Sequence, residues 1–128
     1  MKIDKIIKEE IENLNNSLTL YHGTSLENGT RLIEFGWKPS NGKTGGNMGQ
    51  SRYLYLTSDP EDAMWFANEM GENFIVEVSN IPITYLRPDP EDEAGYTMAE
   101  LLDMMKSTKL PSKFVLTKEL GAEHFKKL

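Results

Sequence analysis

The stretch SLTLYHG, residues 17–23, decides how this chain begins to fold. It is a short β-like run that ends at glycine, a residue that permits tight turns and close backbone approach. Directly after it, Thr24 and Glu27 have the spacing of a capping box, in which two side chains satisfy free N–H groups at a helix start. This pattern predicts a helix that runs to about Phe35 and ends at Gly36. The first unit is therefore expected to be strand, turn and helix.

The remaining segments predict further strands and helices without a regular strand–helix–strand alternation. A capping box at Ser58 and Glu61, with Pro60 in the first turn and Gly71 at the end, predicts a well-marked helix, and Thr97 begins another. This mixture favours an α+β fold. The expected strands cover residues 52–58, 73–79, 83–87 and 113–116, and the expected helices cover residues 2–16, 24–35, 58–71, 97–107 and the tail from residue 118.

Length and composition indicate one globular domain. The chain has 128 residues, of which 38% are hydrophobic, and we expect a helical flank over 1–16 followed by the main domain over 17–128. The absence of cysteine excludes disulfides and thiolate metal sites. The first sixteen residues lack the apolar core of a signal peptide, and no stretch approaches the length of a membrane span. We expect a soluble protein of the cytoplasm, or of the host-cell cytoplasm if a phage encodes it.

The glycine-rich stretch NGKTGGNMGQ, residues 41–50, raises the question of a nucleotide phosphate loop. A Walker-type loop requires a glycine at position 37, where this chain has Trp37, and the glycines after Thr44 make a poor helix start. An ATPase loop is therefore excluded. The surrounding cations Lys38, Lys43 and Arg52 have no acidic neighbour between Phe35 and Ser58, although the net charge of the chain is −6. Such a local positive field suits one small anion better than a nucleic-acid backbone.

His22 is the histidine with the context of a functional site. It ends a predicted strand, precedes a glycine and faces a predicted helix start, whose N–H groups favour anions. The other histidine, His124, lies in the charged tail and is expected at the surface. No nucleophile elbow, Cys–His pair or metal-binding His spacing is present, so a serine hydrolase and a metal site are not expected. The acidic run 89–93 lacks the ligand spacing of an EF-hand.

Three segments in this order resemble the ADP-ribosyltransferases of the His-Tyr-acid type, the diphtheria-toxin and poly(ADP-ribose) polymerase branch. These are YHGT at 21–24, the glycine loop over 40–46, and YLYLTSDPEDAMWFA at 53–67, followed by an acid after the next strands. Within this branch, the likeness is greatest to the small rifampin ADP-ribosyltransferases, and it covers roughly residues 20–92. The resemblance implies a single domain with a split, mixed β-sheet core and flanking helices. The C-terminal third and the N-terminal helix depart from the rifampin enzymes, which puts a rifamycin substrate in doubt.

The resemblance also implies a site for NAD as substrate, with no metal. His22 would bond the adenosine ribose, the backbone of Gly23 would bond the nicotinamide amide, and Thr24 completes the motif. Tyr55 and Trp65 would sandwich the nicotinamide, because flat aromatic faces suit a flat pyridinium ring. The loop residues Lys43 and Arg52 are expected at the pyrophosphate and at the base of the loop.

A carboxylate near the ribose would stabilise positive charge as the nicotinamide–ribose bond breaks. The best match to the catalytic acid of the rifampin enzymes is Asp89, and Glu91 and Asp92 are close alternatives. The catalytic set expected from the resemblance is thus His22, Tyr55 and Asp89.

Two functions of different classes follow from the sequence. The first is an NAD-dependent mono-ADP-ribosyltransferase, whose acceptor is a small molecule such as a rifamycin, or a protein, in preference to a nucleic acid. The alternative is a non-catalytic module of the same fold that binds NAD, another nucleotide or a partner protein. A third and more distant idea is an RNA 2′-phosphotransferase, which would be expected to carry more arginine in its site. The sequence leaves the acceptor, the oligomeric state and the biological setting open.

Overall fold

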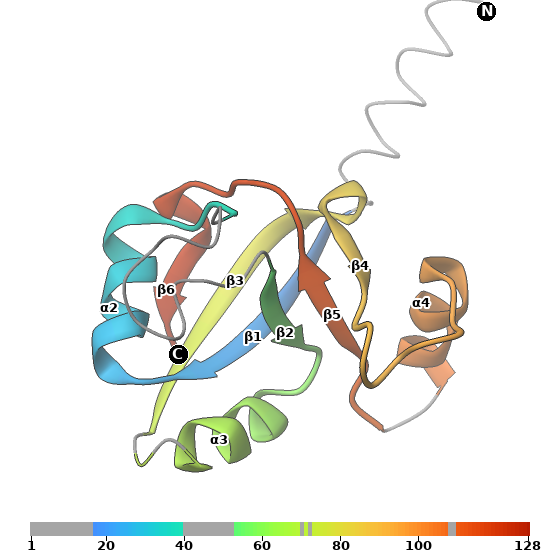
Figure 1. Ribbon diagram of the computed structural model, residues 1–128, viewed down its shortest axis with the longest axis horizontal. Coiled ribbons are helices and arrows are strands. Elements are labelled where there is room, and N and C mark those ends of the chain that lie inside the picture. Colours follow the sequence, from blue (N-terminus) through green and yellow to red (C-terminus); the bar gives the residue numbers. More distant parts are fainter. Residues whose placement is uncertain (1–16, 40–52, 70, 72, 108–109) are drawn as a thin grey trace, which may run out of the picture.

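The computed structural model describes residues 17–39, 53–69, 71, 73–107 and 110–128, and it has the expected α+β architecture (Figure 1). The predicted helix over 2–16 and the glycine loop, with Lys43 and Arg52, lie outside the described residues. The strands are β1 (Ser17–Thr24), β2 (Leu54–Thr57), β3 (Phe74–Pro82), β4 (Leu86–Pro88), β5 (Lys113–Leu116) and β6 (Phe125–Lys127). The helices are α2 (Leu26–Phe35), α3 (Pro60–Glu69) and α4 (Met98–Ser107), and short 3₁₀ turns cover Ile83–Tyr85 and Ala122–His124.

The six strands form one sheet in the order β4-β5-β2-β1-β3-β6, and every pairing among the described residues is antiparallel. The expectation of a mixed sheet is therefore wrong. Helices between strands usually act as crossovers that connect parallel neighbours. Here α2 connects the antiparallel neighbours β1 and β2. By contrast, α3 connects β2 to β3, which run in the same direction but are separated by β1, a strand antiparallel to both.

The sheet narrows sharply at its centre. In the described residues, β1 and β2 are paired only at Tyr21 and Thr57. By contrast, β1 pairs with β3 along almost its whole length, and β2 pairs with β5 through all four of its residues. The sheet thus consists of one half formed by β1, β3 and β6 and another formed by β2, β4 and β5, which meet at a narrow junction.

The helices pack on different parts of this sheet (Figure 1). α2 contacts β3 and β6, α3 contacts the ends of β1, β2 and β3, and α4 contacts β4. The core between them is built from leucine, valine, isoleucine and phenylalanine side chains, among which Leu20, Val76, Val78, Ile81, Leu101, Phe114 and Leu116 have no exposed surface. No helix among the described residues is long and apolar enough to cross a membrane.

The helix starts show which capping predictions were right. At α4 the capping box is reciprocal: the Thr97 N–H donates to Glu100 Oε1 (3.0 Å), and the Glu100 N–H donates to Thr97 Oγ1 (3.1 Å). The box predicted at Thr24 is wrong, because β1 continues through Thr24 and the Oγ of Ser25 caps α2 instead. At α3, Asp59 accepts the Glu61 N–H (2.9 Å), which makes Asp59 the cap in place of the predicted serine.

Two segments near the end of the chain differ from their predicted form. Residues 83–87, predicted as a strand, form a 3₁₀ turn followed by the short β4. The tail from Lys118, predicted as a helix, ends in β6, where Phe125 pairs with Val78 and is buried. Pairing with β3 buries this phenylalanine against the core, and this tertiary gain overrides the local helical preference of the tail.

Candidate functional site

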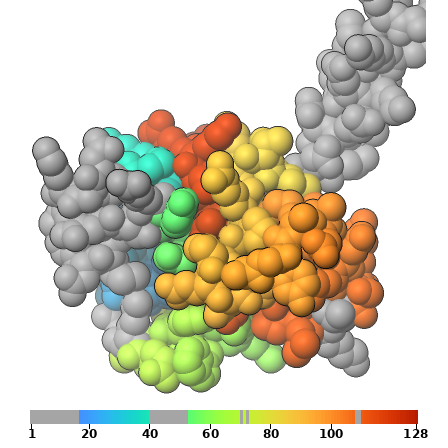
Figure 2. Space-filling view, turned by 45° about the vertical axis from the view of Figure 1, so that its right-hand side comes forward, coloured from blue at the N-terminus to red at the C-terminus, as the bar shows by residue number. Residues whose placement is uncertain are grey.

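A cavity of about 340 Å³ opens at the junction of the two half-sheets, beside α3. Its walls come from β1, β2, α3, the first residue of β5 and the segment after β4, which lies directly against α3 in the space-filling view (Figure 2). The lining residues are Tyr21, His22, Gly23, Tyr55, Leu56, Thr57, Ala63, Phe66, Asp89, Glu91, Asp92 and Lys113. The structure therefore brings His22, Gly23, Tyr55 and all three candidate acids to one cavity.

His22 bridges the narrow junction with its side chain. Its Nδ1 lies 2.7 Å from the backbone oxygen of Tyr55 on β2, and only 8% of the residue is exposed. Burial lowers the pKa of His22 below its ordinary value of 6.5, and the hydrogen bond to Tyr55 opposes this effect only in part. The ring is therefore neutral at pH 7. Because a carbonyl oxygen can only accept, Nδ1 carries the proton, and Nε2 keeps a lone pair that can accept a hydrogen bond from a ligand hydroxyl.

Tyr55 forms an aromatic wall of the cavity and is 42% exposed. Burial raises the pKa of its phenol, and the negative charges of Glu91, Asp89 and Tyr53 raise it further, in that order. The hydroxyl consequently stays protonated at neutral pH and is available as a hydrogen-bond donor. The ring offers a flat face of the kind that planar ligands stack on.

Gly23 lets α3 approach β1 closely. A Cβ atom built on Gly23 would overlap the backbone oxygen of Ala63 and lie 3.0 Å from the backbone nitrogen of Ala67. Both alanines are fully buried, so the face of α3 that meets the sheet consists of small side chains. This glycine is needed for packing, and the same close approach sets the position of α3 beside the cavity.

The three acids after β4 differ in their surroundings. Asp89 is only 6% exposed, and its Oδ1 accepts the N–H groups of Glu91 (2.8 Å) and Asp92 (3.2 Å). Asp92 is paired with Lys113 Nζ at 2.9 Å. The carboxylate of Glu91 is exposed in the cavity wall and has no hydrogen-bond or ion-pair partner in the part of the chain that the structure describes.

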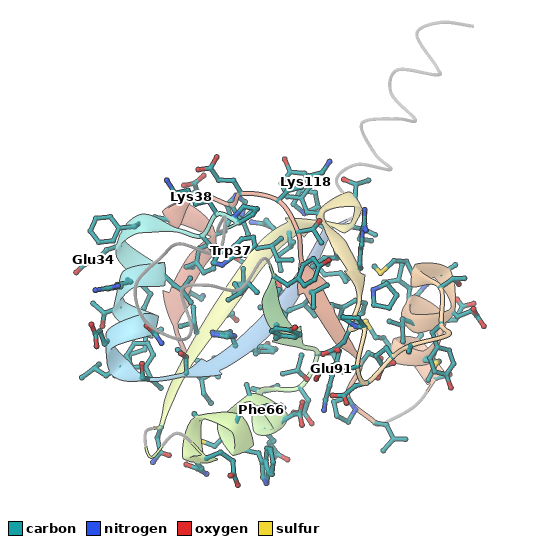
Figure 3. The ribbon with its side chains drawn as sticks, in the orientation of Figure 1. Glu34, Trp37, Lys38, Phe66, Glu91 and Lys118 are labelled. Atoms are coloured by element: carbon teal, nitrogen blue, oxygen red, sulfur yellow. The ribbon has the colours of Figure 1, made fainter. Side chains whose placement is uncertain are left out.

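Phe66, and not Trp65, lines the cavity from α3. Figure 3 shows Phe66 and Glu91 at the same end of the sheet. Trp65 is 57% exposed and is not among the residues that line the cavity, but it contacts the Phe66 ring edge-on with 5.1 Å between ring centroids. Lys113 Nζ lies 5.3 Å from the centroid of Phe66. The sequence contained a signal for Phe66, because in a helix that buries Ala63 and Ala67 the residue at 66 lies on the flank of the buried face.

Thr24, like Trp65, does not line the cavity, and Lys43 and Arg52 lie outside the described residues. Thr24 is fully buried, and its Oγ1 has no hydrogen-bond partner among the described residues. No cluster of three or more His, Asp or Glu side chains suitable for a metal ion occurs among the described residues. Lys113, by contrast, is a cavity residue that sequence reasoning missed, because only the sheet topology brings β5 next to the acidic segment.

The charge of the cavity wall is negative. Among its described residues, three carboxylates face one ammonium group, and the one histidine is neutral at pH 7. Three aromatic residues, Tyr21, Tyr55 and Phe66, line the same cavity, and Ala63 and Leu56 supply aliphatic surface. Such a cavity suits a flat, positively charged ring, which gains both stacking and charge attraction.

No protein-family model, curated protein or solved structure matches this chain in sequence or fold.

Proposed function

We propose that this chain is an NAD-dependent mono-ADP-ribosyltransferase with an ADP-ribosyltransferase-like fold. The observation that carries the proposal is the cavity at the junction of the half-sheets, where His22, Tyr55 and the acidic segment meet. NAD holds a positively charged pyridinium ring joined to a ribose. An electronegative cavity with Tyr21, Tyr55 and Phe66 among its lining residues fits that ring.

His22 and Gly23 would hold the two ends of the folded substrate. The bare Nε2 of His22 would accept a hydrogen bond from a ribose hydroxyl, a role that requires the neutral ring favoured by burial. The backbone of Gly23 lines the cavity and offers peptide groups to an amide such as that of nicotinamide. Tyr55 and Phe66 would contact the nicotinamide ring, and Phe66 takes the part that the sequence assigned to Trp65.

The reaction would begin with heterolysis of the bond between ribose C1′ and the nicotinamide nitrogen. The electron pair leaves with nicotinamide, which becomes neutral, and positive charge develops on the ribose, as in other glycosyl transfers. A nucleophilic atom of the acceptor then bonds to C1′ and loses its proton. A fixed carboxylate beside the ribose would stabilise the developing charge electrostatically.

We assign this stabilising role to Glu91 and a loop-fixing role to Asp89. Among the described residues, the Glu91 carboxylate has no hydrogen-bond or ion-pair partner, and its charge raises the pKa of the Tyr55 phenol more than that of Asp89 does. Asp89 already accepts two backbone N–H groups, which hold its side chain in a tight turn. The resemblance to the rifampin enzymes favours Asp89 as the acid, so the two assignments are distinguished by mutation.

The test is release of nicotinamide from NAD by the purified chain, measured by chromatography with and without acceptors. Glu91→Gln is expected to lower the rate about 100-fold, as loss of one preorganised charge does elsewhere. Asp89→Asn should mainly lower the melting temperature. Tyr55→Ala and His22→Ala should raise the concentration of NAD at which nicotinamide release reaches half of its maximal rate. A normal rate in Glu91→Gln with a large loss in Asp89→Asn would reverse the assignment.

The acceptor is sought with labelled NAD, supplied separately to a cell lysate and to rifampicin, followed by mass analysis for added ADP-ribose. Stabilisation of the chain by NAD without any release of nicotinamide would instead favour a non-catalytic binding module. Absence of both NAD binding and release contradicts the proposed function.

A further inference from the structure

Lys113 lies where three elements of the cavity meet. It is the first residue of β5, and its side chain extends to the acidic segment after β4 and to the ring of Phe66 on α3. Its side chain is 23% exposed. Desolvation opposes its positive charge, but the hydrogen bond to Asp92 and the charges of Asp62, Asp92 and Asp89 raise the pKa of Lys113 above 10.5. The ammonium group is therefore charged at neutral pH.

The acidic segment is bound to Lys113 at two points. The backbone oxygen of Lys113 accepts the Asp89 N–H at 3.1 Å, and Nζ donates to Asp92 Oδ2 at 2.9 Å. Within the segment, Asp89 Oδ1 accepts the Glu91 and Asp92 N–H groups, and the Glu93 N–H donates to the Asp89 backbone oxygen at 2.9 Å. Lys113 thus fixes both the beginning and the end of the turn that presents Glu91.

These contacts leave the three carboxylates in different states. The Asp89 side chain is occupied by backbone N–H groups, and the Asp92 side chain is occupied by the ammonium group. Glu91, between them, has no such partner among the described residues. The same ammonium group lies over the ring of Phe66. One side chain therefore contacts both the acidic turn and an aromatic residue of the cavity wall.

We propose that Lys113 is a positioning residue of the cavity. It neutralises Asp92 and fixes the turn so that, of the three acids that line the described part of the cavity, Glu91 presents the free carboxylate to the substrate. This inference rests on the proposed function for its catalytic consequence, whereas the organisation of the turn is a property of the free chain. Without the ammonium group, the Asp92 charge would be unbalanced beside two other carboxylates. Mutual repulsion would then move the turn and displace Glu91.

The chain offers a matched control in a second lysine–carboxylate pair. Lys126 on β6 binds Glu77 on β3 at 2.8 Å, a distance close to that of the Lys113 pair. Neither Lys126 nor Glu77 lines the cavity. Replacing Lys126 therefore shows what the loss of an ion pair outside the cavity does to the protein. Exposed pairs of this kind contribute little to stability.

The first experiment measures amide hydrogen exchange in the free protein by NMR. In Lys113→Met, the amides of Glu91, Asp92 and Glu93 are expected to exchange about threefold faster, as for loss of a partly exposed ion pair. Lys113→Arg should restore slow exchange, and Lys126→Met should leave these amides unchanged. Unaltered exchange of the three amides in Lys113→Met would overturn the proposal, whether or not the chain has enzymatic activity.

The second experiment measures nicotinamide release by the same variants. Lys113→Met is expected to lower kcat about tenfold while the KM for NAD stays within about twofold, because mispositioning acts on the reacting geometry more than on binding. Lys113→Arg should recover most of the rate, and Lys126→Met should match the unmodified chain. Equal loss in Lys113→Met and Lys126→Met would assign a merely structural role to Lys113. If the unmodified chain releases no nicotinamide, the proposed function fails and the exchange experiment alone decides whether Lys113 holds the turn.

Discussion

At the scale of single residues, His22 combines a structural role with a proposed ligand-binding role, and each role uses a different ring nitrogen. Nδ1 donates to the Tyr55 backbone oxygen and supplements the one backbone pairing of β1 with β2 in the described residues, whereas Nε2 is left for a ligand. The sequence predicted the importance of this residue from its place before a glycine. It gave no information on the hydrogen bond, whose partner lies 33 residues away.

The lowered pKa of His22 makes stability depend on pH. The unfolded chain takes up a proton near pH 6.5, while the folded chain resists it until a lower pH, so the unfolding free energy falls as the pH drops below about 6.5. Because a single proton is involved, this group contributes a slope of at most about 1.4 kcal/mol per pH unit. Urea unfolding between pH 7.5 and 5.5 measures this pH dependence of the unfolding free energy.

The control is His22→Asn, which keeps a donor for the Tyr55 oxygen but cannot take up a proton. This variant should lose the part of the pH dependence that His22 contributes. Identical slopes for the two proteins would contradict the prediction.

At the scale of elements, α3 depends on small residues at its contact with β1. Gly23→Ala places a Cβ against the backbone of Ala63, which cannot move without shifting the helix. We expect a loss of about 1–3 kcal/mol in the free energy of unfolding, as in other overpacked cores. Denaturant melts of the variant measure this loss.

Gly121→Ala is the control for this experiment. Its Cβ would meet only the flexible carboxylate end of Glu123, and the backbone at Gly121 has a φ of −70°, which alanine adopts freely. A change within about 0.5 kcal/mol is expected there. If Gly23→Ala were as stable as Gly121→Ala, the close contact of α3 with the sheet would be refuted.

The elements also show how far local patterns carry a prediction. The α+β class and most of the strands followed from alternation and turn residues, and the Thr97 capping box was right because both of its partners are local. The cap of α2 was misplaced by one residue, since β1 extends further than alternation alone indicates. Trp65 was assigned from the family resemblance, and the structure places its neighbour Phe66 in the cavity wall instead.

At the scale of the whole molecule, the two half-sheets differ in extent. β1 and β3 have eight and nine residues and pair over most of their length, whereas β2, β4 and β5 have only three or four residues each. The halves share one backbone pairing in the described residues and the His22 side-chain bond. The arrangement of strands was beyond prediction, because the order in a sheet is set by contacts between segments distant in sequence.

This asymmetry predicts two levels of local stability. Native-state amide exchange in low denaturant should show β2, β4 and β5 opening together at a lower free energy than β1 and β3, because fewer backbone hydrogen bonds hold them. One common opening free energy for all five strands would show that the narrow junction does not separate the halves.

The narrow junction has a further consequence for the covalent path of the chain. The polypeptide passes from one half-sheet to the other between β1 and β2, between β2 and β3, between β3 and β4, and again between β5 and β6. The halves are therefore interlaced by the backbone, and neither corresponds to a continuous piece of sequence that could be cut out or exchanged as a module. Few hydrogen bonds join the halves directly among the described residues, yet the four passages of the chain limit how far the two walls of the cavity can separate.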